Sequence, residues 1–166
     1  MVIGTYAFGS IAKRTCSPSW SPTNEKVSRT IEDALTQVGS GFTHVVQDNP
    51  SQGDEIRPDS HATRLGRALA VAGAPVGNKN SYSITGFPAW SESAPQELKK
   101  DLVLLFVRER GVQQEGKATL VVQSDRCSDY FERIAQLIRD ITGETVTASE
   151  HGVTISANAV RELGLA

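Results

Sequence analysis

Apolar residues recur at helical spacing in two long stretches of the chain. Between residues 24 and 38 they are separated by three or four positions, with Thr23 before them as a cap and Gly39 just after them. The stretch 128–142 shows the same spacing. A period of 3.6 residues gathers such positions on one side of a helix. We therefore expect amphipathic helices over 24–38 and 128–142.

Shorter runs rich in β-branched and aromatic residues predict strands. The run LVLLFV is apolar at six successive positions, which is typical of a strand covered on both faces, and we expect it to pair antiparallel with ATLVV. Two further strands are expected around a turn at 150–152. The predicted strands are 2–8, 41–47, 80–87, 102–107 and 118–122, with the last pair inside 144–157.

Two weaker helices and one long loop complete the expected fold. Residues 61–73 predict a helix capped by Asp59 or Ser60, and 158–165 a terminal helical turn. Residues 48–60 are polar, contain two prolines and predict a surface loop. The fold class is α+β: an antiparallel sheet with two or three helices packed on one face, in a single domain of residues 1–166. We find no internal repeat in the sequence.

Composition narrows the classes of function. A formal charge of -2 over 166 residues gives no global attraction to polyanions, so nucleic-acid binding would require a local basic patch. The two cysteines, Cys16 and Cys127, are too few for a structural zinc set, and the sequence leaves open whether they pair. No apolar run is long enough to span a membrane, and no secretory signal is found. We expect a cytoplasmic or virion protein without metal or cofactor.

Two groups of residues are candidates for a catalytic site. Cys127 precedes a predicted helix with Arg133 six residues later, the spacing of phosphatases that use a cysteine nucleophile. The segment between them lacks phosphate-binding glycines and carries Asp129 and Glu132, which favours a structural thiol. His61 opens an HxT sequence, but a phosphoesterase needs a second such histidine motif, which is missing. These patterns favour a non-catalytic protein.

Taken in order, GAPVGNKNSYSITGF, KKDLVLLFVRERGVQQEGKATLVVQSD and the helix 128–142 resemble the coat proteins of single-stranded RNA bacteriophages over about residues 73–143. In that family an antiparallel sheet contacts RNA and the following helices join two subunits. The resemblance implies RNA contacts at Lys79, Arg108, Arg110 and Lys117. It also implies a dimer seam on the apolar helix face, formed by Tyr130, Ile134, Leu137, Ile138 and Ile141.

Three functions follow as expectations. The first is a self-associating structural protein, most specifically a coat-type capsid subunit of a virion that binds RNA. The alternative is a small immunity or adaptor protein that binds a partner protein through the loop 48–60. The third is a phosphoester-acting enzyme that uses Cys127 and Arg133, or His61.

Overall fold

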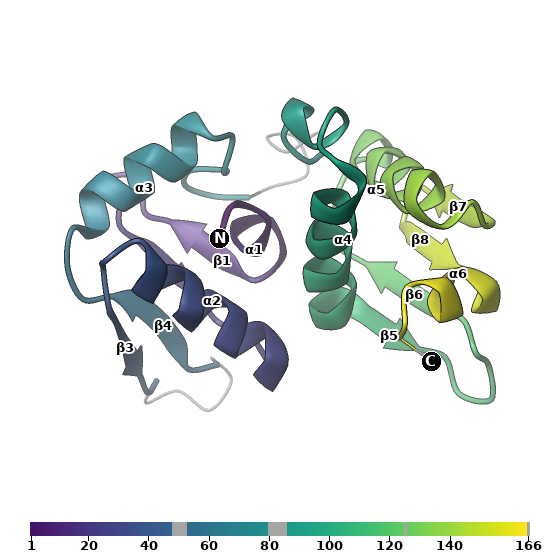
Figure 1. The fold of residues 1–166 in the computed structure, drawn as a ribbon, viewed down its shortest axis with the longest axis horizontal. Coiled ribbons are helices and arrows are strands. Elements are labelled where there is room, and N and C mark those ends of the chain that lie inside the picture. Colours follow the sequence, from purple (N-terminus) through teal and green to yellow (C-terminus); the bar gives the residue numbers. More distant parts are fainter. Residues whose placement is uncertain (48–52, 80–85, 125, 166) are drawn as a thin grey trace. The chain divides into compact units, whose positions relative to one another are not determined.

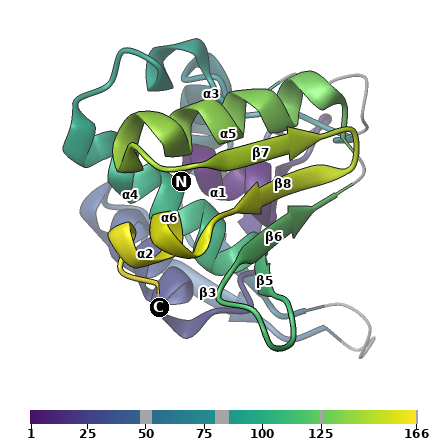
Figure 2. The same ribbon diagram turned by 90° about the vertical axis from the view of Figure 1, so that its right-hand side faces the viewer.

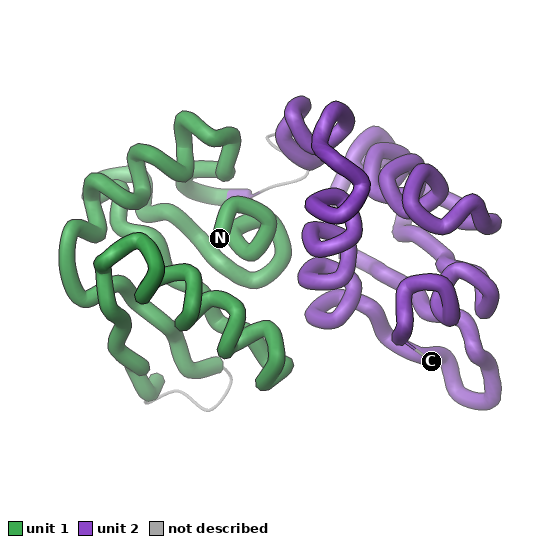
Figure 3. The backbone as a smooth tube through the Cα atoms, in the orientation of Figure 1, with its two compact units in different colours: residues 1–78 green, residues 79–166 purple. Residues whose placement is uncertain are grey.

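The computed structural model describes residues 1–47, 53–79, 86–124 and 126–165. The chain divides into two compact units, residues 1–78 (unit 1) and residues 79–166 (unit 2) (Figure 3). Each unit holds one four-stranded antiparallel sheet, so the α+β class is confirmed. The expected single domain stays a prediction, because compactness does not show whether a unit unfolds independently.

Unit 1 is a sheet in the order β1-β2-β4-β3 with helices against it (Figure 1). Helix α1 contacts β1 and β2, α2 contacts β3 and β4, and α3 contacts β2. The buried core joins Trp20 and Ile56 from the sheet to Ile31 and Leu35 from α2. The elements are α1 (Val2–Ala7), β1 (Gly9–Ile11), β2 (Pro18–Trp20), α2 (Glu25–Gln37), β3 (Phe42–Val45), β4 (Glu55–Pro58) and α3 (Ala62–Val71).

Unit 2 has the sheet order β5-β6-β8-β7 (Figure 2). Helix α4 contacts β5 and β6, α5 contacts β7 and β8, and α6 contacts α5. Four aromatic rings interlock edge-to-face in its core, with the Phe87 and Phe106 centroids 5.1 Å apart. The elements are a 3₁₀ turn (Ala89–Ser91), α4 (Gln96–Arg110), β5 (Gly111–Gln113), β6 (Leu120–Gln123), α5 (Ser128–Thr142), β7 (Val146–Ser149), β8 (Gly152–Ile155) and α6 (Ala157–Glu162).

The two units repeat one topology, helix-strand-strand-helix-strand-strand-helix, with the same strand order. The pairing registers match as well. Gly9 opposes Trp20 in unit 1 as Gly111 opposes Val122 in unit 2. Trp20 in turn opposes Ile56, as Val122 opposes Val153. The expectation of no internal repeat is therefore corrected: the repeat lies in topology and register, which an identity search along one sequence does not detect.

Two predicted strands are helices. Residues 2–7 form α1, in which Thr5 Oγ1 donates to the Met1 carbonyl oxygen at 3.1 Å and the Tyr6 hydroxyl donates to the Gly73 carbonyl oxygen at 2.7 Å. Ile3 and Ala7 are buried. Tertiary packing here overrides the strand preference of a β-branched and aromatic sequence.

The strand predicted at 102–107 is wrong, because this run is the centre of α4. Its flanks, QELKKD and RER, are strong helix formers, and the whole segment between Pro95 and Gly111 is far longer than a typical strand. Strand β6 pairs instead with β5 and β8. Six apolar residues in a row cannot by themselves separate a buried strand from a buried helix.

The other predicted elements are confirmed with local changes. The helices expected at 24–38, 61–73 and 128–142 are α2, α3 and α5, and the expected strands at 41–47 and around 150–152 are β3 and the β7–β8 hairpin. Asn24 rather than Thr23 caps α2, and the N-cap residue of α3 is His61 rather than Asp59 or Ser60. Residues 55–58 form β4 rather than a loop. The strand expected at 80–87 falls largely outside the described residues.

Candidate nucleic-acid interface

One face of the unit 2 sheet is left open by all the helices that the structure describes in this unit. Helices α4 and α5 lie against the other face, where Val122 and Val153 are buried. Because side chains alternate along a strand, the residues between these positions point away from the helices. The pairing brings four of them into one row across all strands, which we call the outer row: Val112, Val121, Thr154 and Thr147.

The strands that carry the outer row are uncharged. Their sequences are GVQ, LVVQ, GVTI and VTAS, without a charged or aromatic residue among the four described strands. Val112 is 68% exposed. Gln123 and Ser149 lie on the same face beside Gly152. The face thus offers methyl groups, hydroxyls and a carboxamide to solvent.

Three cations gather at one end of this sheet: Lys79, Arg110 and Arg126, which we call the cationic cluster. Arg126 donates from Nη1 to the Lys79 carbonyl oxygen, and its guanidinium lies 6.0 Å from the Tyr130 ring centroid. Burial, and then the nearby guanidinium groups of Arg126 and Arg110, lower the pKa of Lys79 to about 8. The neighbouring positive charges disfavour its protonated form.

The cationic cluster and the outer row are continuous. Arg110 directly precedes β5, and a shallow hollow of about 410 Å³ is lined by Arg110, Val112, Val121 and Gln123. Glu109 and two further glutamines, Gln113 and Gln114, also line it. One ligand lying on the uncharged strands would therefore reach a positive charge at their end.

The structure brings together two of the four predicted RNA contacts, Lys79 and Arg110. Arg108 is exposed in the last turn of α4, and Lys117 lies in the β5–β6 turn, where its Nζ donates to Gln114 Oε1 at 3.2 Å. Arg126 was missed by the sequence analysis. It follows β6 by three residues, so its place beside Arg110 becomes visible only once β5 and β6 are paired.

The predicted dimer seam is the core of unit 2. Tyr130, Ile134, Leu137 and Ile138 are at most 4% exposed, and Ile141 is half-buried. Helix α5 packs this face against β7 and β8 of its own unit. The interpretation of the helix face as an open seam is therefore corrected: the same amphipathic pattern serves a core and an interface, and here its own sheet covers it.

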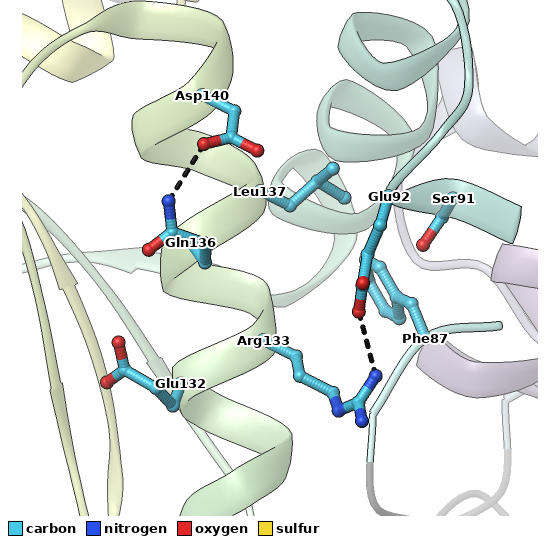
Figure 4. Close-up of a pocket in the computed structure, with 8 residues that line it drawn as sticks. All are labelled: Phe87, Ser91, Glu92, Glu132, Arg133, Gln136, Leu137 and Asp140. Atoms are coloured by element: carbon cyan, nitrogen blue, oxygen red, sulfur yellow. Dashed lines mark hydrogen bonds and ion pairs between the residues drawn. The ribbon is translucent and has the colours of Figure 1, made fainter. Parts of the chain in front are cut away.

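Cys127 and Arg133 are not combined into one site. Cys127 is the N-cap residue of α5, a half-buried cysteine outside any disulfide, and its side chain makes no capping hydrogen bond. Arg133 lines a separate pocket of about 390 Å³, where Nη1 donates to Glu92 Oε1 at 2.8 Å (Figure 4). A guanidinium held by a carboxylate is a poor phosphate ligand, because an incoming anion must displace that pair.

The same pocket is acidic at its rim. Glu132 and Asp140 line it with Glu92, while Phe87 and Leu137 supply apolar surface (Figure 4). Asp140 Oδ1 accepts from Gln136 Nε2 at 2.8 Å, and its Oδ2 lies 3.8 Å from Lys99 Nζ. Glu132 Oε1 accepts a hydrogen bond from Arg139 Nη1 at 2.8 Å. Each of the three carboxylates that line the pocket therefore has a partner within the unit.

His61 belongs to unit 1, where it is exposed at the start of α3 with a left-handed φ of 55°. It makes no capping hydrogen bond there. Among the described residues, no three histidine, cysteine or acidic side chains form a metal-binding group. Of the adaptor surface expected at 48–60, residues 48–52 lie outside the described residues and residues 55–58 form β4. No helix within the described ranges has the length and apolar character needed to cross a membrane.

Neither the models of known protein families nor the curated proteins gave a match to this chain. The resemblance to phage coat proteins therefore stays an untested prediction. One of the segments on which the resemblance rests differs in structure, because residues 102–107 form a helix where the coat-protein pattern needs a strand.

Proposed function

We propose that this protein is a non-catalytic nucleic-acid-binding protein that contacts duplex DNA through the open face of the unit 2 sheet. The observation that carries the proposal is the continuity of an uncharged outer row with the cationic cluster. Phosphate contacts position a protein on nucleic acid, and base contacts supply specificity. The cationic cluster fits the first role and the strands fit the second.

The chemistry of the outer row suits base edges in a major groove. Valine and threonine methyl groups pack against the thymine methyl, threonine hydroxyls bond to base edges, and a glutamine pairs with adenine through two hydrogen bonds. A groove about 12 Å wide accepts a two-stranded β-ribbon. The hairpin of β5 and β6 carries Val112, Val121 and Gln123 on such a ribbon.

The lack of aromatic residues on this face favours duplex over single-stranded ligands. Proteins that bind single-stranded RNA on a sheet stack the unpaired bases on exposed aromatic rings. The four described strands of unit 2 offer none. Duplex RNA is disfavoured as well, because its major groove is too deep and narrow for a ribbon. The proposal thus replaces the RNA expected from the sequence with DNA.

The net charge of unit 2 does not oppose the proposal. Residues 79–166 contain ten Lys and Arg against twelve Asp and Glu. None of these charges lies in a strand, and several acids are paired on the helix side, as in the Arg133–Glu92 and Arg139–Glu132 contacts. Binding to phosphates depends on local charge, since interactions beyond about 10 Å are screened at 0.1 M salt.

Fluorescence anisotropy of the full chain with a duplex of about 30 base pairs at about 50 mM salt tests the proposal, because electrostatic binding is strongest at low salt. We expect micromolar or tighter binding, with weaker binding to single-stranded RNA of the same sequence. Arg110→Ala should reduce the slope of log affinity against log salt by about 1, the value for one lost phosphate contact. Val121→Glu should weaken binding at least about tenfold, through charge repulsion and lost base contact.

Arg161→Ala provides the matched control, because Arg161 is an exposed cation on α6. It should leave affinity and salt slope unchanged. Duplex binding that is absent at low salt, or equal losses for Arg110→Ala and Arg161→Ala, would contradict the proposed face. Tighter binding to single-stranded RNA than to duplex DNA would favour the RNA binding that was expected from the sequence.

Self-association, adaptor binding and phosphoester chemistry stay predictions without support from a specific contact. The helix face expected to join two subunits is buried in the core of unit 2. The loop expected to bind a partner protein is only partly described. Arg133, expected to bind a phosphoester, is paired with Glu92. The expected cytoplasmic or virion location is also untested.

A further inference from the structure

Unit 1 carries a row equivalent to the outer row of unit 2, although its chemistry differs. Ser10 opposes Ser19, and Thr43 opposes Arg57. Trp20 and Ile56 pair between these strands and point into the core, so Ser19 and Arg57 are neighbours on the opposite face. The row is thus Ser10, Ser19, Arg57 and Thr43, at the positions that Val112, Val121, Thr154 and Thr147 occupy in unit 2.

A pocket of about 390 Å³ lies on this row. Four hydroxyl groups line it, two from the row and two from the turn between β1 and β2: Ser10, Ser19, Thr15 and Ser17. The Ser10 and Ser19 hydroxyl oxygens are 3.3 Å apart. Glu55 and Arg57 line it too, with Arg57 Nη2 2.7 Å from Glu55 Oε2. The remaining lining residues are Ala12, Pro18, Pro58 and Ala62.

The turn beside this pocket is basic. Residues 12–17 read AKRTCS, with Lys13 and Arg14 exposed and without an acid among them. Two acids beside the row are engaged: Glu55 holds Arg57, and the carboxylate of Asp59 accepts from the Thr43 hydroxyl. Lys13 and Arg14 in the turn therefore supply the positive charge of this face, and the hydroxyl groups of the pocket lie beside that turn.

We propose that this face of unit 1 is a second contact surface for the same duplex, binding its phosphodiester backbone rather than its bases. The inference rests on the proposed function of unit 2. Hydroxyls of serine and threonine, with lysine and arginine, are the side chains that bond phosphate oxygens in protein–DNA complexes. The row has neither the valines nor a neighbouring carboxamide of the kind that suit base edges in unit 2.

Two contact surfaces in one chain raise affinity through effective concentration. Once one unit binds, the other meets the same duplex at a local concentration set by the linking segment, and avidity gains of about 10² to 10⁴ are known when both surfaces can engage together. A chain that uses both surfaces should protect more of the duplex than one sheet can cover. The length of the protected segment therefore reports the second surface directly.

The test compares charge reversal at two places in unit 1, within the full chain. Lys13→Glu with Arg14→Glu reverses the charge of the basic turn of unit 1, where both side chains are exposed. Arg29→Glu is the control, because Arg29 is 71% exposed on α2, on the helix side of the same sheet. Affinity, salt slope and the hydroxyl-radical footprint are measured on a duplex of about 30 base pairs, which is long enough for more than one contact region.

We expect the Lys13/Arg14 variant to lose at least about tenfold in affinity, to reduce the salt slope by about 2 and to shorten the footprint. Arg29→Glu should retain the full footprint. An unchanged footprint and slope in the Lys13/Arg14 variant, with Val121→Glu still weakening binding, would overturn the second surface alone. A wild-type chain that does not bind duplex DNA would overturn the proposed function itself.

Ser19→Asp supplies an independent variant within the row. It places a carboxylate beside Ser10 in the pocket, and repulsion from phosphate should weaken binding in the same direction. Normal thermal unfolding of this variant with unchanged DNA binding would also contradict the second surface.

Discussion

Gly9 and Trp20 face each other across β1 and β2, and the indole occupies the space that a side chain at Gly9 would need. A Cβ built at Gly9 would lie 2.4 Å from Trp20 Cδ1 and 2.8 Å from the Ser19 carbonyl oxygen. Trp20 is fully buried at the centre of the unit 1 core, with no hydrogen bond to its Nε1 among the described residues. Glycine at this position allows the strand to approach the ring closely.

Gly9→Ala should destabilise the protein by about 1 to 3 kcal/mol, because the added methyl forces the ring or the strand to move in a packed core. Denaturant unfolding monitored by fluorescence measures the change. Gly53→Ala is the matched control, since its nearest neighbour, Ser21 Cβ, would be 3.9 Å away.

The same variant tests whether the chain unfolds as one domain. Both tryptophans stay in place, because Gly9→Ala acts through the Trp20 ring, and the amide NMR signals of unit 1 and unit 2 are followed separately through a denaturant titration. The single-domain prediction requires Gly9→Ala to shift the transitions of both units equally. A shift confined to the amides of unit 1 would show that the two units unfold separately.

Gly66→Ala should also destabilise, against the usual trend within a helix. Alanine normally stabilises a helix interior by about 1 kcal/mol relative to glycine. In α3, however, a Cβ at Gly66 would lie 1.7 Å from the Cys16 carbonyl oxygen, an overlap that requires the helix to shift. Thermal unfolding gives the sign directly, and a gain in stability would show that α3 does not pack on this turn.

Ile134→Ala distinguishes a core from a dimer seam. Ile134 is 1% exposed, and removing its buried methyl and methylene groups should cost about 2 to 5 kcal/mol. The molar mass from sedimentation equilibrium should stay unchanged in the variant. A loss of mass with unchanged stability would restore the seam interpretation.

The partly buried Lys79 ammonium should make stability depend on pH. Its pKa is lowered to about 8 in the folded chain, whereas an exposed lysine titrates near 10.4. Between these values the unfolded chain binds the proton and the folded chain does not, so stability rises with pH. Below about pH 8 both states are protonated and the penalty on the folded state is fully present.

Comparing wild type with Lys79→Gln isolates this contribution from other groups that titrate in the same range. Wild-type stability should rise relative to the variant between about pH 8 and pH 10 and run parallel to it below about pH 8. Parallel curves throughout would show that Lys79 is not partly buried beside Arg126 and Arg110.

The sequence determined those elements whose local pattern and tertiary role agree. The helices α2 and α5 have long amphipathic periods and end at glycines with left-handed φ, Gly39 and Gly143, so each specifies its own boundaries. The β7–β8 hairpin alternates inward and outward residues around a short turn. For the candidate interface, the sequence identified Lys79 and Arg110 as basic residues near a sheet.

Tertiary structure decided the remainder. The run 102–107 and the segment 2–7 are compatible with strand or helix, and packing against a sheet selected the helix in both. Partner strands determine which face of β5 and β6 is open, because alternation alone does not say which side the helices cover. The matching registers of the two units, and the approach of Arg126 to Lys79 and Arg110, join residues far apart in the chain. Such juxtapositions arise only when the strands pair, since no local pattern encodes them.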